Sequence, residues 1–211
     1  MKLSYGEVEA VVRTVHGPGA KPTALLGRLK YLQRFDWPPG GAKGQGSRAG
    51  YGLEQLLALM LALELLELGL PPLRVVRLLR TGWDQTVRAL VIGWGAAFEG
   101  ARPIFLALAP RALEELGMPE DPDRPSPDRL RAVDATTLDS WRDDFTRGSA
   151  ALYVVDPRRI ALAARTELDA LGIAPERDAD AAFIELGTDL FGADEPAVWL
   201  IEGASGRRRR A

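Results

Sequence analysis

Seven basic residues lie between residues 13 and 48, a stretch in which Asp36 is the only acidic residue. Lys and Arg neutralise phosphate groups and release counterions, and Arg can also pair bidentately with guanine. Residues 1–82 contain 11 basic and 6 acidic side chains, whereas residues 83–211 contain 16 basic and 23 acidic ones. The net charge of −2 therefore hides a positive N-terminal part. This distribution predicts that a polyanion is attracted to that part and repelled by most of the rest.

Other kinds of site chemistry find little support in the sequence. The chain has no cysteine, which excludes disulfides and thiolate metal sites, including cysteine-based metal sensing. The only histidine, His16, follows an apolar segment without a carboxylate cluster near it in sequence, so we expect it to be structural or exposed. The acidic residues at 114–115, 143–144 and 178/180 lack metal-ligand spacing, and no phosphate-binding glycine loop or nucleophile elbow occurs. We therefore expect no enzyme, no catalytic residue, no metal and no cofactor.

A helix from Pro22 to about residue 35 is expected to position the basic residues. At 100° per residue, Leu25, Leu29 and Leu32 fall within a narrow arc that can pack inward. The opposite side carries donors and an aromatic ring, from Thr23, Gly27, Lys30, Tyr31 and Arg34. This pattern predicts a helix that buries one face and presents the other to a partner.

The neighbouring segments predict further helices. Ser4 and Glu7 have the spacing of a capping box, and four valines follow at helical spacing up to Gly17. Residues 40–52 are rich in glycine and are typical of a flexible hairpin. A third helix, residues 53–68, is apolar almost all round, which predicts burial on more than one side. A fourth begins at residues 71–72, and its basic stripe is expected to be solvated: Arg74, Arg77 and Arg80.

This order of elements resembles the MerR-type and excisionase-type winged helix-turn-helix families. The resemblance is carried by the runs 5–8 (YGEV), 28–34 (RLKYLQR), 38–39 (PP), 46–51 (GSRAGY) and 68–72 (LGLPP), and it covers about the first 80 residues. In such families the second helix enters the major groove, and the hairpin wing touches backbone or minor groove. A glycine usually ends the family's second helix, where this chain has Phe35 and Asp36.

The resemblance implies which residues contact DNA. Thr23, Lys30, Tyr31 and Arg34 would face the groove, and Arg28 would reach a phosphate from the flank of the helix. Lys43 and Arg48 would serve the wing. The complete expected interface is Lys21, Thr23, Arg28, Lys30, Tyr31, Arg34, Lys43, Gln45, Arg48 and Tyr51.

The sequence of the C-terminal part, residues 83–206, predicts a small α+β domain for effector binding or dimerisation. Residues 84–98 have helical periodicity weakened by Gly93 and Gly95, and further helices are expected from Asp156-Pro157 to Gly172 and over residues 179–191. Short apolar runs predict strands at 104–108, 129–138, 152–155 and 198–201. The expected fold is thus mainly α: a winged helix-turn-helix (1–82), the α+β domain (83–206) and a basic tail (207–211). Arg207 to Arg210 fit non-specific nucleic-acid binding and a solubilising tail equally well.

The leading functional hypothesis is a sequence-specific transcriptional regulator that binds double-stranded DNA as a homodimer. Its C-terminal domain would bind a small effector or a protein partner. A phage- or mobile-element-type architectural protein, excisionase-like or a small packaging subunit, is the first alternative, and a protein-interaction adaptor without DNA binding is the second. We expect a cytoplasmic protein without membrane contact, since the longest apolar run, residues 56–63, is too short to span a bilayer.

Overall fold

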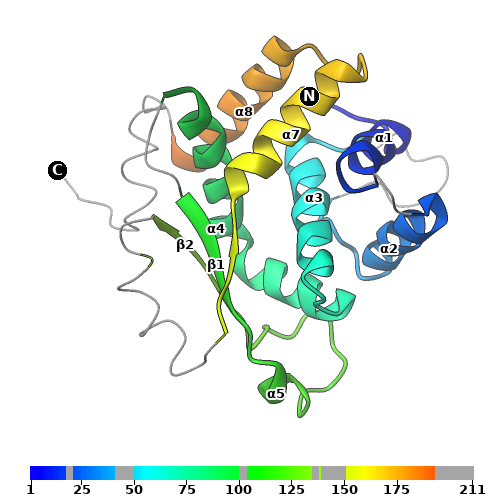
Figure 1. Ribbon diagram of the computed structural model, residues 1–211, viewed down its shortest axis with the longest axis vertical. Helices are drawn as coiled ribbons and strands as arrows, with labels where there is room; N and C mark the ends of the chain where they lie inside the picture. The colour runs from blue at the N-terminus through cyan, green and yellow to red at the C-terminus, as the bar shows by residue number, and fades with distance from the viewer. Residues whose placement is uncertain (18–20, 41–49, 100–103, 135–137, 139–150, 193–211) are drawn as a thin grey trace. The chain divides into compact units, whose positions relative to one another are not determined.

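The protein is described by a computed structural model that covers residues 1–17, 21–40, 50–99, 104–134, 138 and 151–192. Within these residues the chain is mainly helical and contains a small three-stranded antiparallel sheet (Figure 1). This confirms the expected mainly helical class. Most of the expected wing, residues 41–49 of the segment 40–52, lies outside the described residues, so the winged helix-turn-helix stays a prediction.

The chain forms two compact units that do not follow its linear order. Unit 1 comprises Met1–Val76 and Leu162–Leu186, and unit 2 comprises Arg77–Ala161 and Gly187–Ala211. The predicted boundary after residue 82 falls inside helix α4, Pro72–Glu99, as does the division between Val76 and Arg77. A single glycine costs a helix only about 1 kcal/mol. This cost at Gly82 is too small to end a helix that is otherwise well buried.

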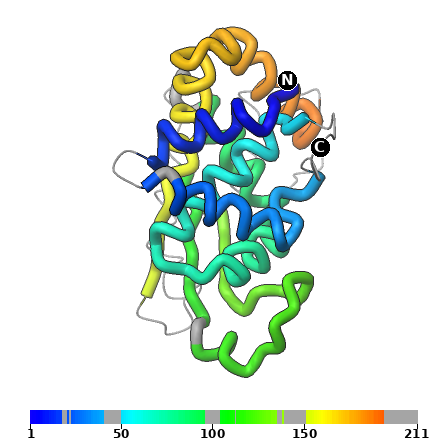
Figure 2. The backbone as a smooth tube through the Cα atoms, turned by 90° about the vertical axis from the view of Figure 1, so that its right-hand side faces the viewer, coloured from blue at the N-terminus to red at the C-terminus, as the bar shows by residue number. Residues whose placement is uncertain are grey.

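Unit 1 contains the first three helices: α1 (Tyr5–His16), α2 (Pro22–Arg34) and α3 (Leu53–Glu67). Helices α1 and α2 are neighbours, and α1 also packs on α3 (Figure 2). Helix α3 has buried side chains on all of its sides, which confirms the prediction from its apolar sequence. The fully buried ones include Leu56, Leu57, Leu59, Met60, Leu61 and Leu65.

Two C-terminal helices match their predicted positions. Helix α7 is Pro157–Ala170 and helix α8 is Glu176–Phe191, with Gly172 between them at a φ of 66°. Arg165 joins the two helices, since its Nε and Nη2 donate to the Asp180 carboxylate at 2.6 and 3.0 Å. Its Nη1 also lies 2.7 Å from Glu176 Oε1.

The sheet of unit 2 has the order β2-β1-β3, and β1 pairs antiparallel with both neighbours. Its strands are β1 (Ile104–Ala109), β2 (Arg129–Asp134) and β3 (Tyr153–Val155), which confirms three predicted strands. Central β1 is the most buried of the three, as its uninterrupted apolar sequence predicts. The fourth predicted strand, residues 198–201, lies outside the described residues.

Gly93 lies inside α4, so the helix expected over residues 84–98 is the second half of α4 and not a separate helix. The helix runs through it for 28 residues in all. A Cβ atom at Gly93 would lie 2.8 Å from Arg158 N and 3.1 Å from its Cα, at the start of α7. The missing side chain therefore allows two backbones of unit 2 to approach closely.

The predicted solvated stripe on α4 is wrong for two of its three arginines. Arg74 is buried, and Arg77 is only 2% exposed. Arg77 Nε donates to the Asp121 carbonyl oxygen at 2.6 Å, Nη2 donates to the Pro119 carbonyl oxygen at 2.5 Å, and Nη1 contacts Glu115 Oε1 at 3.4 Å. Only Arg80, which pairs with exposed Asp123, resembles the expectation. Sequence could not show that the segment after the short helix α5 (Ala112–Glu115) folds against α4.

Candidate nucleic-acid interface

Helix α1 supports the candidate site from behind and begins at a capping box, as predicted. The Ser4 backbone N–H donates to Glu7 Oε2 at 2.6 Å, and the Glu7 N–H donates to Ser4 Oγ at 3.3 Å. The bond from the Ser4 backbone N–H, followed by a hydrogen bond from the Ser4 side chain, favours the ionised carboxylate and lowers the pKa of Glu7. On the inner side of the helix, Val8, Val11 and Val12 are buried.

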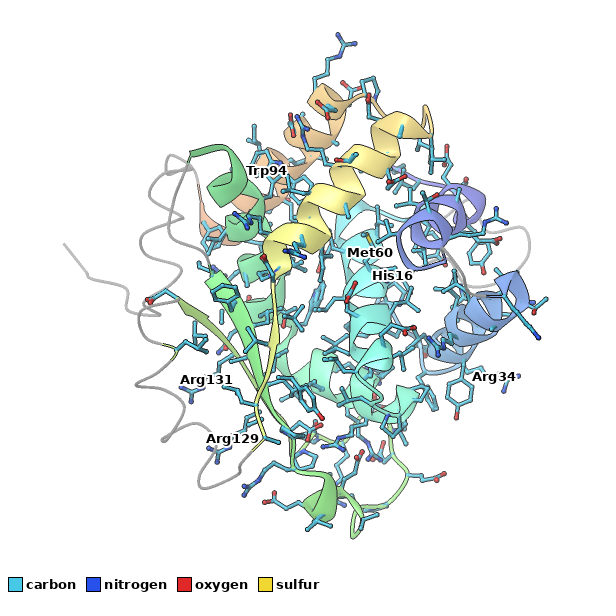
Figure 3. All side chains as sticks on the ribbon, viewed as in Figure 1. His16, Arg34, Met60, Trp94, Arg129 and Arg131 are labelled. Carbon is cyan, nitrogen blue, oxygen red and sulfur yellow. The ribbon has the colours of Figure 1, made fainter. Side chains whose placement is uncertain are left out.

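Helix α2 has the two faces that its sequence predicts. Leu25, Leu29 and Leu32 are all buried. The other side is exposed along the whole helix, and Figure 3 shows Arg34 on the side of α2 turned away from α3. The exposed positions are Thr23, Gly27, Lys30, Tyr31 and Arg34. Because α2 contains no Asp or Glu, this face carries only positive formal charge.

Asp36 and Trp37, which follow α2, fix the end of this helix. Asp36 has a φ of 51°, in the left-handed region where the resembling families usually place glycine, and aspartate is one of the few other residues that adopt it. Trp37 is buried, and its indole N–H donates to the Ala58 carbonyl oxygen at 3.1 Å. The last turn of α2 is thereby held against α3.

An aromatic and basic group lies on the exposed face near the end of α2. Tyr31 is 41% exposed, and its ring contacts Phe35 edge-on with centroids 5.2 Å apart. The Arg34 guanidinium carbon lies 5.9 Å from the centroid of the Tyr31 ring. A cation–π contact at an exposed site contributes only about 0.5–1 kcal/mol, so Arg34 can exchange it for a stronger partner.

Arg28, which was expected to reach a phosphate, forms an ion pair with Glu67 at the end of α3. The two side chains are 47% and 58% exposed, so the pair lies at the surface. Glu67 was not predicted as part of the site because it is 39 residues away in sequence. The signal that was available is the pair Glu64 and Glu67, which ends an otherwise apolar run.

Tyr51 belongs to the core and not to a surface that could contact DNA, which corrects its predicted role. It is 2% exposed, and its hydroxyl accepts a hydrogen bond from Gln33 Nε2 at 3.2 Å. Its backbone N–H and C=O both bond to Leu3, at 2.7 Å each, and its ring packs near Tyr5. Tyr51 is thus buried like the apolar residues of α3 that follow it.

Of the other residues predicted to contact DNA, some are exposed and some lie outside the described part of the chain. Lys21 is exposed at the N-cap of α2, where its side chain makes no capping bond. Lys43, Gln45 and Arg48 lie outside the described residues. The structure thus brings five predicted residues to one helix and its entry: Lys21, Thr23, Lys30, Tyr31 and Arg34, with Arg28 on the flank.

His16 is buried behind the site, which agrees with the structural half of its expected role. Its side chain is 5% exposed, and its Nδ1 lies 3.5 Å from Glu64 Oε1. Within the described part of the chain, its Nε2 is buried without a hydrogen-bond partner. Burial lowers the pKa of His16, and the charge of Glu67 opposes this shift. Burial, followed by the charge of Glu67, raises the pKa of Glu64.

The described residues also bear on metal binding and membrane insertion. No group of His, Asp or Glu side chains among them could hold a metal ion. None of the helices in this part of the chain is long and apolar enough to cross a membrane. The chain matches no family model, no curated protein and no solved structure.

Proposed function

We propose that the protein is a sequence-specific transcriptional regulator that binds double-stranded DNA by placing α2 in the major groove. The observation that carries this proposal is the acid-free, exposed face of α2 above three buried leucines. A helix anchored in this way can enter a groove without exposing its own core. The positive N-terminal part of the sequence adds attraction to the phosphate backbone.

Each exposed side chain has a distinct chemical role in this proposal. Lys30 neutralises a phosphate, and Arg34 leaves Tyr31 to pair with the edge of a guanine. Tyr31 donates its hydroxyl to a phosphate or packs on a sugar. Two copies would read two half-sites about 34 Å apart, as in other helix-turn-helix dimers.

The test begins with selection of bound fragments from genomic DNA, followed by fluorescence anisotropy on the selected duplex. Arg34→Ala is expected to weaken specific binding by about 1–3 kcal/mol and to relax base preference at one position. Lys30→Ala is expected to weaken binding to all sequences and to reduce the slope of log K against log salt by about 0.9.

Arg177→Ala is the matched control, because Arg177 is an exposed arginine of unit 1 on α8. Its substitution removes the same charge as Arg34→Ala. Unchanged affinity and specificity in both α2 variants would contradict the proposed docking. A wild-type protein without DNA affinity would favour the adaptor alternative. DNA bending or assembly along the duplex, in place of protection of a short site, would favour the architectural one.

A further inference from the structure

Two carboxylates, Glu64 and Glu67, occupy the last turn of α3. The C-terminal end of a helix carries partial negative charge, so an acidic residue there is unfavourable. Both carboxylates lie near a basic group that comes from another element. Glu64 lies against buried His16 of α1, and Glu67 pairs with Arg28 of α2.

Both members of the Arg28–Glu67 pair are accessible, whereas only Glu64 is accessible in the His16–Glu64 pair. His16 is almost completely buried, whereas Arg28 and Glu67 are each about half exposed. A surface ion pair of this kind contributes little stability, and an arginine can exchange one oxyanion for another. A DNA phosphate is therefore able to replace the Glu67 carboxylate as the partner of Arg28.

Glu67 also adds negative charge beside a face that is otherwise positive. Helix α2 has no acidic residue of its own, and Glu67 is brought to its flank by the packing of α3. A phosphate that approaches Arg28 must both displace this carboxylate and remain close to it. Each of these effects opposes DNA binding.

We infer that Glu67 competes with DNA phosphate for Arg28 and thereby limits the affinity of the α2 surface for DNA of any sequence. This inference rests on the proposed function. Arg28 contacts no base in this arrangement, so the competition acts on the phosphate backbone and leaves base preference unchanged.

The test compares Glu67→Gln with Glu185→Gln in binding to the selected duplex and to an unrelated one. Glutamine keeps the size of the side chain, and exposed Glu185 on α8 of unit 1 loses the same charge away from α2. Glu67→Gln is expected to tighten binding to both duplexes by about two- to fivefold, the range that a surface ion pair can supply. Its log–log salt slope is expected to steepen by about 0.9, which corresponds to one additional phosphate contact.

Arg28→Ala provides a second comparison, because Glu67→Gln should not steepen the salt slope in that background. If wild type binds DNA and Glu67→Gln behaves like Glu185→Gln, the competition is refuted and the proposed function stands. If the wild type binds neither duplex, the proposed function fails and the inference fails with it.

Discussion

The buried guanidinium of Arg77 gives a sharp test of how the structure assigns roles to similar arginines. Arg77 and Arg80 lie one turn apart on α4, and sequence pattern places both on one stripe. The structure buries Arg77 among two carbonyl oxygens and a carboxylate, whereas Arg80 meets a highly exposed aspartate. Replacing each with Met keeps most of the apolar stem and removes the charged head.

The expected loss of stability follows from the number and environment of these contacts. Arg77 makes two strong bonds to carbonyl oxygens, at 2.6 and 2.5 Å, and a longer one at 3.4 Å. Breaking a fully buried charged network costs about 3–5 kcal/mol. Pro119 and Asp121 are surface residues, so water will reach their carbonyl oxygens, and we expect about 2–4 kcal/mol for Arg77→Met. Arg80→Met should cost less than Arg77→Met, because the Asp123 carboxylate that it leaves behind is 81% exposed and stays hydrated.

Urea unfolding of the two variants and wild type measures the difference in free energy, provided that the dependence on urea is unchanged. Amide hydrogen exchange of residues 116–127 adds a local measurement, since Arg77→Met should increase exchange in this segment more than Arg80→Met does. Equal stability of the two variants, with equal exchange in the segment, would refute the assignment of Arg77 as the residue that holds it.

Three further predictions concern other contacts of the fold. Gly93→Ala should lower the free energy of unfolding in urea by about 1–3 kcal/mol, because the added methyl group meets the backbone of α7. Gly82→Ala should be neutral or stabilising by up to about 1 kcal/mol, because its methyl group makes ordinary contacts. Burial lowers the pKa of His16 in the folded protein, so just below pH 6.5 the unfolded chain binds more protons than the folded protein does. The free energy of unfolding therefore decreases as the pH falls from 6.5. His16→Gln should flatten that part of the curve in urea titrations at stepped pH, while the raised pKa of Glu64 acts in the opposite direction in both proteins. Arg165→Met breaks bonds to two carboxylates of α8 and should cost about 1–3 kcal/mol, with the greatest loss of exchange protection in α7 and α8.

The two-faced nature of α2 could be predicted from sequence because it depends only on spacing along one helix. Leu25, Leu29 and Leu32 lie within one arc whatever surrounds the helix, and burial of that arc places Lys30 and Arg34 outside. Short apolar runs indicated the strands for a similar reason, since a central strand such as β1 must be apolar on both faces.

The contacts that the sequence did not reveal join residues far apart in the chain. Arg28 and Glu67 are 39 residues apart, and Arg77 contacts a carbonyl oxygen 44 residues away. Tyr51 follows a glycine-rich segment and resembles a surface residue until its bonds to Leu3 and Gln33 are seen. The sequence predicts that Gly93 weakens its helix because glycine has low helix propensity, although what matters at this position is the backbone of α7.

Charge counted along the chain therefore overestimates the positive field that DNA would meet at α2. Lys21, Lys30 and Arg34 present their charge at the surface of this helix, whereas Arg28 is neutralised by Glu67 from α3. Because Arg34 pairs with a guanine edge in the proposed complex, Lys21 and Lys30 are left as two phosphate contacts and give a log–log salt slope of about −1.8 per subunit. Displacement of the Glu67 carboxylate from Arg28 raises the magnitude of this slope to about 2.7. A steeper measured slope would require cations outside α2, and a slope that Glu67→Gln does not change would mean that Glu67 does not keep Arg28 from a phosphate. In the proposed complex, the Arg28–Glu67 ion pair between α2 and α3 would thus reduce the attraction of this surface for a phosphate backbone below what the basic sequence of α2 alone predicts.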